Sequence, residues 1–105
     1  MSFTLTIDGR EPPAVFSAFD ANAVPYLRSN LVCGDFQIAS SAGKIAMLAE
    51  RKTWSDLCGS ISSKHLQEQM CRMIEQSKAT GARPLLIVEC EKVHSWRRGK
   101  GRPGA

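Results

Sequence analysis

The alternation of apolar and polar residues predicts one strand and one short helix in the first thirty positions. Phe3–Asp8 alternates as a strand does when only one of its faces is buried. Residues 9–13 interrupt the pattern with glycine and proline, which are typical of turns. Residues 22–29 favour a short helix or turn, because Pro25 is tolerated near the start of a helix.

The middle of the chain predicts two strands joined by a turn. Residues 31–39 form an apolar run that continues with alternating character, and Asp35 is expected within this strand or at a bend in it. Residues 40–43 have the composition of a turn, and residues 44–52 lead back as a second strand. Such a hairpin would bring Asp35 and Glu50 side by side.

Two helices and a last strand are expected after residue 52. Residues 55–61 fit a helix start with one apolar face, and residues 66–78 repeat apolar side chains at helical spacing. Thr80-Gly81 supplies a stop signal. The continuous apolar run Leu85–Val88 predicts a central strand that is buried on both faces.

The composition bounds the class of protein. With 105 residues and 43% apolar content, the chain can form one domain with a modest core. Because it has no long apolar run and no signal-like N-terminus, we expect a soluble intracellular protein without a membrane span. The cysteines form no ligand cluster, so we expect small buried side chains in a reducing compartment rather than zinc ligands; a disulfide framework is the alternative for Cys33, Cys58, Cys71 and Cys90.

The net charge of +4 comes from the end of the chain. Residues 1–91 hold nine basic and ten acidic side chains, or −1, whereas five basic residues follow with no acid. We expect one domain over residues 1–92, which the resemblance described below implies is a nuclease domain, and a basic flexible tail over residues 93–105. The tail is either a solvated end or a DNA-binding segment that contacts phosphates through Arg97, Arg98, Lys100 and Arg102.

The segment from Glu50 to Asp56 carries the candidate chemistry. Side chains alternate between the faces of a strand, so Glu50 and Lys52 share one face while Arg51 points to the other. The carboxylate can ligate Mg²⁺, and the ammonium can stabilise charge that develops on phosphorus. Asp35 would supply a second oxygen ligand, and the preceding Gly34 suits a bulge or a close backbone approach.

These residues resemble the XPF nuclease domain, of the excision-repair cross-complementation group four type, which includes the Mus and Hef endonucleases. The resemblance covers about residues 3–90. It is carried, in order, by Asp8-Gly9-Arg10-Glu11, Gly34-Asp35, Glu50-Arg51-Lys52, Asp56-Leu57, Ser60-Ile61, Leu66, Gln69 and Leu85–Glu89.

The resemblance implies an α/β, restriction-endonuclease-like fold with a central mixed β-sheet flanked by helices, here with a shortened C-terminal part. It implies Mg²⁺- or Mn²⁺-dependent cleavage of one strand near flaps, forks and junctions, in DNA repair or recombination. The implied catalytic residues are those that match the signature: Asp35, Glu50, Arg51, Lys52 and Asp56. Asp8 and Glu11 match acidic residues after the first strand, and either could face the metal that Asp35 and Glu50 bind.

The chain departs from the family at two places. The interval from Asp35 to Glu50 is longer, which a longer hairpin arm would absorb. The strand, helices and helix-hairpin-helix modules that usually follow Leu85–Glu89 are not found, so we expect a homodimer, or a heterodimer with a helix-hairpin-helix protein, on branched DNA. A non-catalytic DNA-binding or scaffolding module stays an alternative, as do structural roles for Arg51, Asp56 and Gln69.

Overall fold

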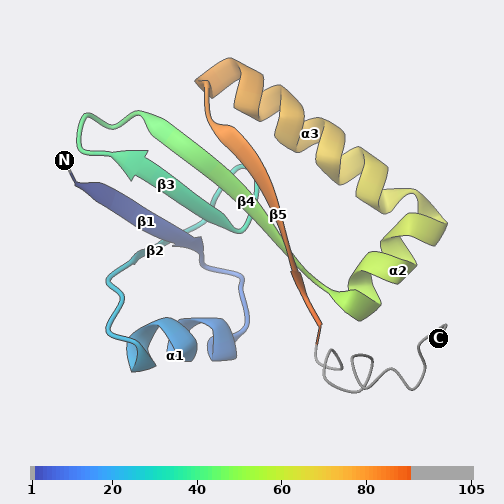
Figure 1. Cartoon of the computed structure of the whole chain (residues 1–105), viewed down its shortest axis with the longest axis horizontal. Coiled ribbons are helices and arrows are strands. Elements are labelled where there is room, and N and C mark those ends of the chain that lie inside the picture. Colours follow the sequence, from blue (N-terminus) through green and yellow to red (C-terminus); the bar gives the residue numbers. More distant parts are fainter. Residues whose placement is uncertain (1, 91–105) are drawn as a thin grey trace, which may run out of the picture.

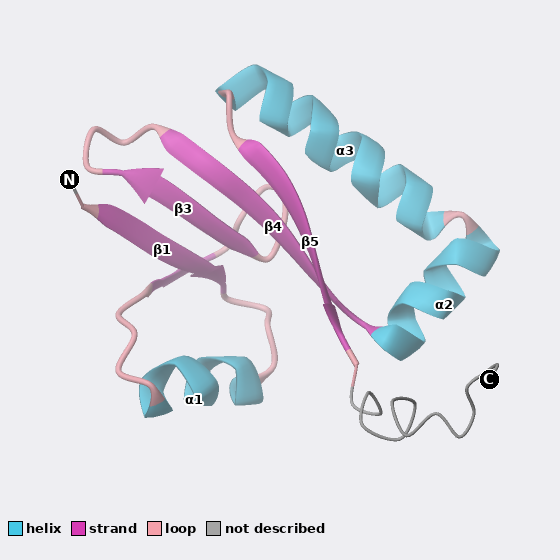
Figure 2. Cartoon of the chain, in the orientation of Figure 1, coloured by secondary structure: helices cyan, strands magenta, loops and turns pink. Residues whose placement is uncertain are grey.

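The computed structural model describes residues 2–90, and its sheet and helices form one α/β unit (Figures 1 and 2). The elements follow one another along the chain as β1 (Phe3–Asp8), α1 (Pro13–Ala21), β2 (Leu27–Ser29), β3 (Phe36–Ser40), β4 (Ile45–Thr53), α2 (Trp54–Ser63), α3 (His65–Thr80) and β5 (Arg83–Glu89). This arrangement confirms the predicted fold class.

The five strands form one mixed sheet in the order β2-β1-β3-β4-β5. The central strands β1, β3 and β4 are antiparallel, whereas β2 runs parallel to β1 and β5 runs parallel to β4. The hairpin of β3 and β4, its turn after Ser40, and the strand β1 were all predicted correctly. A register shift between Ile38 and Ala39 lies in this hairpin.

Helices cover both faces of the sheet, with α1 on one side and α2 and α3 on the other (Figure 1). On the first side Phe16 of α1 packs with a cluster that includes Ala49 of β4. On the other side Met73 of α3 packs against Leu48 of β4. Because Leu48 and Ala49 are neighbours on one strand, the two clusters must lie on opposite faces. Neighbouring residues of β4 therefore present their side chains to different environments.

Three expectations for the N-terminal half were wrong. A helix forms at Pro13–Ala21, where the prolines had indicated only a break, because proline is favoured in the first turn of a helix. The expected helix or turn over residues 22–29 is instead a loop that ends in β2, which pairs with β1. The expected strand over residues 31–33 is a bend, in which Val32 is 95% exposed.

The last strand was predicted in the right place but in the wrong environment. Within residues 2–90, β5 pairs with β4 alone and forms an edge of the sheet. Leu85, Ile87 and Val88 are 43%, 38% and 40% exposed, so the strand is not buried on both faces. The cysteines differ too: Cys58, Cys71 and Cys90 are exposed rather than buried, and Cys33 is partly buried.

Candidate active site

The candidate site lies where β4 runs beyond the start of β3. β3 pairs with β4 only as far as Phe36 and Ala49, and Asp35 continues the contact by donating its backbone N–H to the Ala49 carbonyl at 2.7 Å. The Asp35 carboxylate then accepts a hydrogen bond from the Arg51 backbone N–H, also at 2.7 Å. The Asp35 carboxylate therefore accepts the hydrogen bond that a backbone carbonyl of a neighbouring strand would otherwise accept. This bond holds Asp35 against β4.

Gly34 makes this close approach possible. Its backbone has φ +80°, and a Cβ atom at this position would lie 2.9 Å from the Ala49 carbonyl oxygen. L-residues with a side chain rarely adopt this conformation, and they would also collide with β4. The prediction of a close backbone approach at Gly34 is confirmed.

Glu50 and Asp35 form a carboxyl pair. Partial burial and the nearby Asp35 carboxylate, which also shares a hydrogen bond with Glu50, raise the pKa of Glu50 to about 7. The Lys52 ammonium acts in the opposite direction, which places it close enough to interact with Glu50. Two carboxyl groups that share a proton are an arrangement that a divalent cation can occupy in place of that proton.

Lys52 is held in place by a residue of α2. Its ammonium donates to the Ser60 hydroxyl at 2.9 Å, and each of the two residues is only 8% exposed. Helix α2 follows β4 directly and begins at the Thr53 N-cap, whose hydroxyl accepts from the Asp56 N–H at 3.1 Å. This short connection brings Ser60 back under the strand. Lys52 therefore has a fixed position beside Glu50.

Arg51 points to the opposite face, as predicted. Its guanidinium pairs with Glu11 at 2.7 Å and with Glu89 of β5. The same Glu11 carboxyl lies near Asp35: burial, Asp35 and Asp8 raise its pKa, while Arg51 lowers it. Arg51 thus joins the loop after β1 to β4 and β5.

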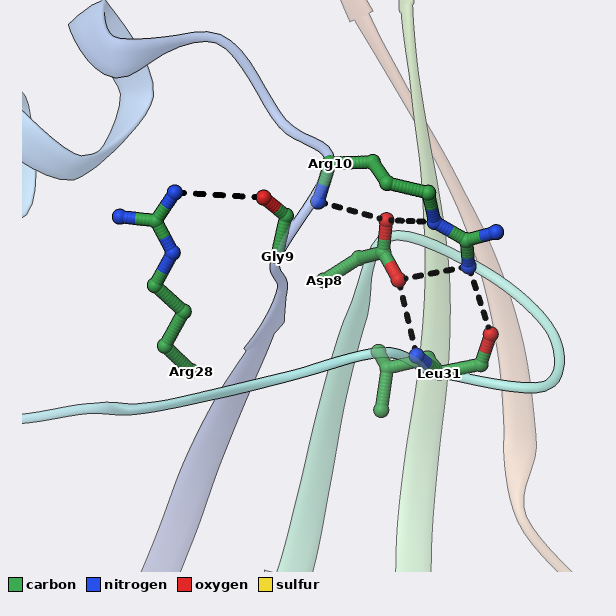
Figure 3. Close-up of polar contacts among 5 residues, drawn as sticks. All are labelled: Asp8, Gly9, Arg10, Arg28 and Leu31. Carbon is green, nitrogen blue, oxygen red and sulfur yellow. Dashed lines mark hydrogen bonds and ion pairs between the residues drawn. The ribbon is translucent and has the colours of Figure 1, made fainter.

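Asp8 is engaged by two loops (Figure 3). Its carboxylate accepts from the backbone and side chain of Arg10 and, at 2.8 Å, from the Leu31 N–H. The Arg10 hydrogen bonds lower the pKa of Asp8 to about 2, and the residue is only 4% exposed. Arg10 also donates to the Leu31 carbonyl, and the Asp8 N–H donates to the Asp35 carbonyl at 2.8 Å. Asp8 therefore fastens the segment that carries Asp35.

The remaining predicted residues are not part of this group. Asp56 lies exposed in the first turn of α2, where a carboxylate favours the helix N-terminus. Gln69 of α3 is partly buried, and its side-chain oxygen has no hydrogen-bond partner among the described residues. The tail residues Arg97, Arg98, Lys100 and Arg102 lie outside residues 2–90.

The structure adds roles that the sequence reasoning did not assign. Ser60 matched the family pattern, yet its contact with Lys52 was not foreseen. A signal existed, since Ser60 follows Leu57 by three residues and so shares the inward face of α2. Arg10 was likewise noted only as part of a motif.

The donors at the site suit a hard divalent cation. Carboxylate oxygens are what Mg²⁺ and Mn²⁺ prefer, and Mg²⁺ commonly binds through one or two carboxylates while it keeps several waters. Within residues 2–90 no three His, Cys, Asp or Glu side chains are grouped as ligands, so the fit rests on the Asp35 and Glu50 pair.

A family model now decides the relationship: that of the ERCC4 domain matches residues 7–102, most of the chain. The chain belongs to the ERCC4 family. ERCC4 domains, the XPF-family nuclease domains, are typically metal-dependent nucleases that act on DNA. This match confirms the family and fold expected from the signature residues. A comparison with curated proteins finds no match. In the described part of this ERCC4 domain, no helix is long and apolar enough to cross a membrane.

Proposed function

We propose that this ERCC4 domain is a divalent-metal-dependent endonuclease that cuts one strand of branched DNA, such as flaps, forks and junctions, in repair or recombination. The observation that carries the proposal is the carboxyl pair of Asp35 and Glu50 with Lys52 beside it. Membership of a family that acts on DNA supports this choice of substrate.

Asp35 and Glu50 would hold Mg²⁺ or Mn²⁺ in this proposal, with Glu11 as a further carboxylate close enough to interact with both. When bound, the metal supplies Lewis-acid stabilisation of phosphate charge and lowers the pKa of a bound water. Asp8 contributes by fixing the Asp35 segment rather than as a ligand, since its oxygens already accept hydrogen bonds from Arg10 and Leu31.

Lys52 is the group assigned to the phosphate. An ammonium has three N–H donors, and one of them is directed to Ser60. The other two can donate to a non-bridging phosphate oxygen or to the attacking water, where positive charge stabilises the transition state. Arg51 acts as a positioning residue through its pairs with Glu11 and Glu89. Asp56 is assigned a supporting role at the start of α2.

A nicking assay on labelled forked and flapped DNA tests the proposal. Mg²⁺ or Mn²⁺ should support cleavage, whereas Ca²⁺ should support binding only. Asp35→Asn, Glu50→Gln and Lys52→Met should each remove most of the activity while circular dichroism shows an intact fold. Glu75→Gln, at an exposed glutamate of α3, is the matched control and should cut at the wild-type rate. Equal nicking by all the variants would refute the assignment.

A non-catalytic DNA-binding or scaffolding module of the same fold is the second candidate. It is favoured by one observation, that the described residues offer two paired carboxylates rather than a group of three metal ligands. The nicking assay separates the endonuclease from the non-catalytic module. The module would bind forked DNA with Mg²⁺, Mn²⁺ or Ca²⁺ present, but it would not cut the DNA with any of them.

DNA contact by the basic tail and association with a partner complete the proposal. Residues 1–91 carry a net charge of −1, so the attraction to phosphates would come from Arg97, Arg98, Lys100 and Arg102. A homodimer, or a complex with a helix-hairpin-helix protein, would add further DNA-binding surface. Sedimentation at micromolar concentration, with and without such a protein, tests this part directly.

A further inference from the structure

Trp54 is a large aromatic side chain that the fold does not bury. It is the first residue of α2, directly after β4, and it is 56% exposed. The capping hydrogen bond at this point joins Thr53 and Asp56, so the start of the helix does not depend on the indole. In the part of the chain that the structure describes, neither apolar cluster includes Trp54. Tryptophan is highly buried on average, and exposed tryptophan is enriched where a protein contacts a partner.

The place of Trp54 in the chain sets it beside the candidate site. It follows Lys52 by two residues, so the two Cα atoms are at most about 7 Å apart. Thr53 is in register with Glu89, the last residue of β5, so α2 begins where β4 and β5 end (Figure 1). Because one DNA strand rises about 3.4 Å per nucleotide, a phosphate bound at Lys52 is within about two nucleotides of Trp54.

Two acidic side chains near the start of α2 are directed or engaged elsewhere. Successive residues of a helix are rotated by about 100°, so Asp56 lies about 160° round the axis from Trp54. Glu89 forms an ion pair with Arg51. A DNA strand can therefore approach the indole on the side away from Asp56, where the charge of Glu89 is balanced.

One other aromatic side chain among residues 2–90 is comparably exposed, and it lies far from the site. Phe3, also 56% exposed, is in register with Ser40, next to the turn between β3 and β4. Asp35 and Glu50 lie toward the opposite end of these two strands. Of the two exposed rings, only that of Trp54 is at the end of the sheet that carries the site.

We propose that Trp54 stacks on an unpaired DNA base, on the same strand as the phosphate held at Lys52. The inference rests on the proposed function and adds the feature of branched DNA that is recognised. A planar ring stacks on any base, whereas a base inside a duplex is already covered by its neighbours and must first be extruded at a cost. Trp54 therefore favours DNA with unpaired bases beside the cut, which a flap or a fork has and a continuous duplex lacks.

Binding of labelled DNA to the full chain in Ca²⁺ tests the stacking without cleavage. Trp54→Leu keeps apolar bulk but removes the flat ring, so it should bind a fork with single-stranded arms about tenfold more weakly and a blunt duplex equally well. Trp54→Phe should retain most of the affinity for the fork. Phe3→Leu is the matched control and should bind both DNAs like the wild type. Circular dichroism should show the same fold for all of these variants.

Abasic nucleotides, placed one at a time along the unpaired arm, locate the contact. At one position the missing base should weaken binding by the wild type about tenfold and leave Trp54→Leu unaffected, since the same stacking contact is lost only once. Equal binding of the fork by Trp54→Leu and the wild type, an equal loss on fork and duplex, or no abasic position that separates the two proteins would overturn the inference.

Two further outcomes separate this inference from other readings. A Trp54→Leu variant that binds DNA normally but changes the sedimentation of the full chain would assign the indole to a protein partner, and would overturn the inference as well. A wild type that binds forks in this way but does not cut them in Mg²⁺ would refute the endonuclease and leave the stacking supported, because the binding measurements involve no cleavage.

Discussion

Glu50→Gln should stabilise the metal-free protein at alkaline pH while it abolishes activity. In the folded protein the pKa of Glu50 is raised from an ordinary 4.5 to about 7 by burial and by Asp35. Folding therefore disfavours the charged form. The wild type loses stability as pH rises from about 4.5 to about 7, and the loss is then complete. A neutral glutamine does not incur this loss.

The magnitude follows from the size of the shift. The difference between 4.5 and about 7 corresponds to at most about 3 kcal/mol at about 1.4 kcal/mol per unit. Because the carboxyl is only partly buried, solvent screening reduces this to about 1–2 kcal/mol. For a domain of this length, each kcal/mol changes the melting temperature by about 4–8 °C. At pH 8 we therefore expect Glu50→Gln to melt roughly 5–10 °C above the wild type.

Thermal unfolding followed by circular dichroism in EDTA, between about pH 4.5 and 8.5, measures the effect. The difference between variant and wild type should be near zero at the acid end and grow to a plateau above pH 7. Glu75→Gln should follow the wild type throughout, because Glu75 is exposed and is not among the groups that shift the pKa of Glu50. Mg²⁺ at pH 8 should stabilise the wild type but not Glu50→Gln. A difference that does not change with pH would refute the reasoning about Glu50.

Three further predictions address the surroundings of the site. Gly34→Ala should lower the free energy of unfolding, measured by chemical denaturation, by about 2–3 kcal/mol and should also lower the nicking rate. Gly43→Ala is the control: Gly43 has a similar φ of +85° but no neighbour within 4 Å, so its free energy of unfolding should fall by less. Ser60→Ala should slow nicking and cost about 1–3 kcal/mol, because it leaves buried Lys52 without its acceptor; Ser60→Thr should recover most of the rate, and full activity of the alanine variant would contradict this role. Deleting residues 95–105 should lower the log–log salt slope of DNA binding by about 0.9 per lost phosphate contact, and an unchanged slope would show a solvated end.

The hairpin that carries the site could be predicted because its signals are local. Alternation on both arms, and the turn residues between them, are enough to set Asp35 beside Glu50. The burial of Leu85–Val88 could not be predicted, because an apolar run is the same in a central strand and at an edge. Burial depends on whether another strand pairs with the free side, and the apolar run itself carries no information about that pairing. The short β2 was missed for a similar reason. Its pairing with β1 is accompanied by a contact distant in sequence, in which the Leu31 N–H of the following loop donates to Asp8.

The contacts of Asp8 and Ser60 show a second limit of sequence reasoning. A motif identifies a carboxylate near the site, but only geometry shows that two loops already use its oxygens. In the same way, the strand pattern places Lys52 on one face of the sheet. It does not show that the Ser60 hydroxyl accepts a hydrogen bond from Lys52, because that contact depends on how α2 turns back after β4. Such contacts join residues whose spacing carries no periodic signal.

The hydrogen bond from the Arg51 backbone N–H to the Asp35 carboxylate makes this amide a natural reporter. Other strand amides are protected from exchange with solvent deuterium by neighbouring backbone, but this one depends on a single acidic side chain. Its exchange rate would therefore follow how long Asp35 stays in place, one residue from Glu50, in the absence of any substrate. Opening of the loop over residues 31–35 would expose this amide and dismantle the carboxyl pair in the same event. The exchange rate of the Arg51 amide therefore reports both the opening of this loop and the loss of the carboxyl pair.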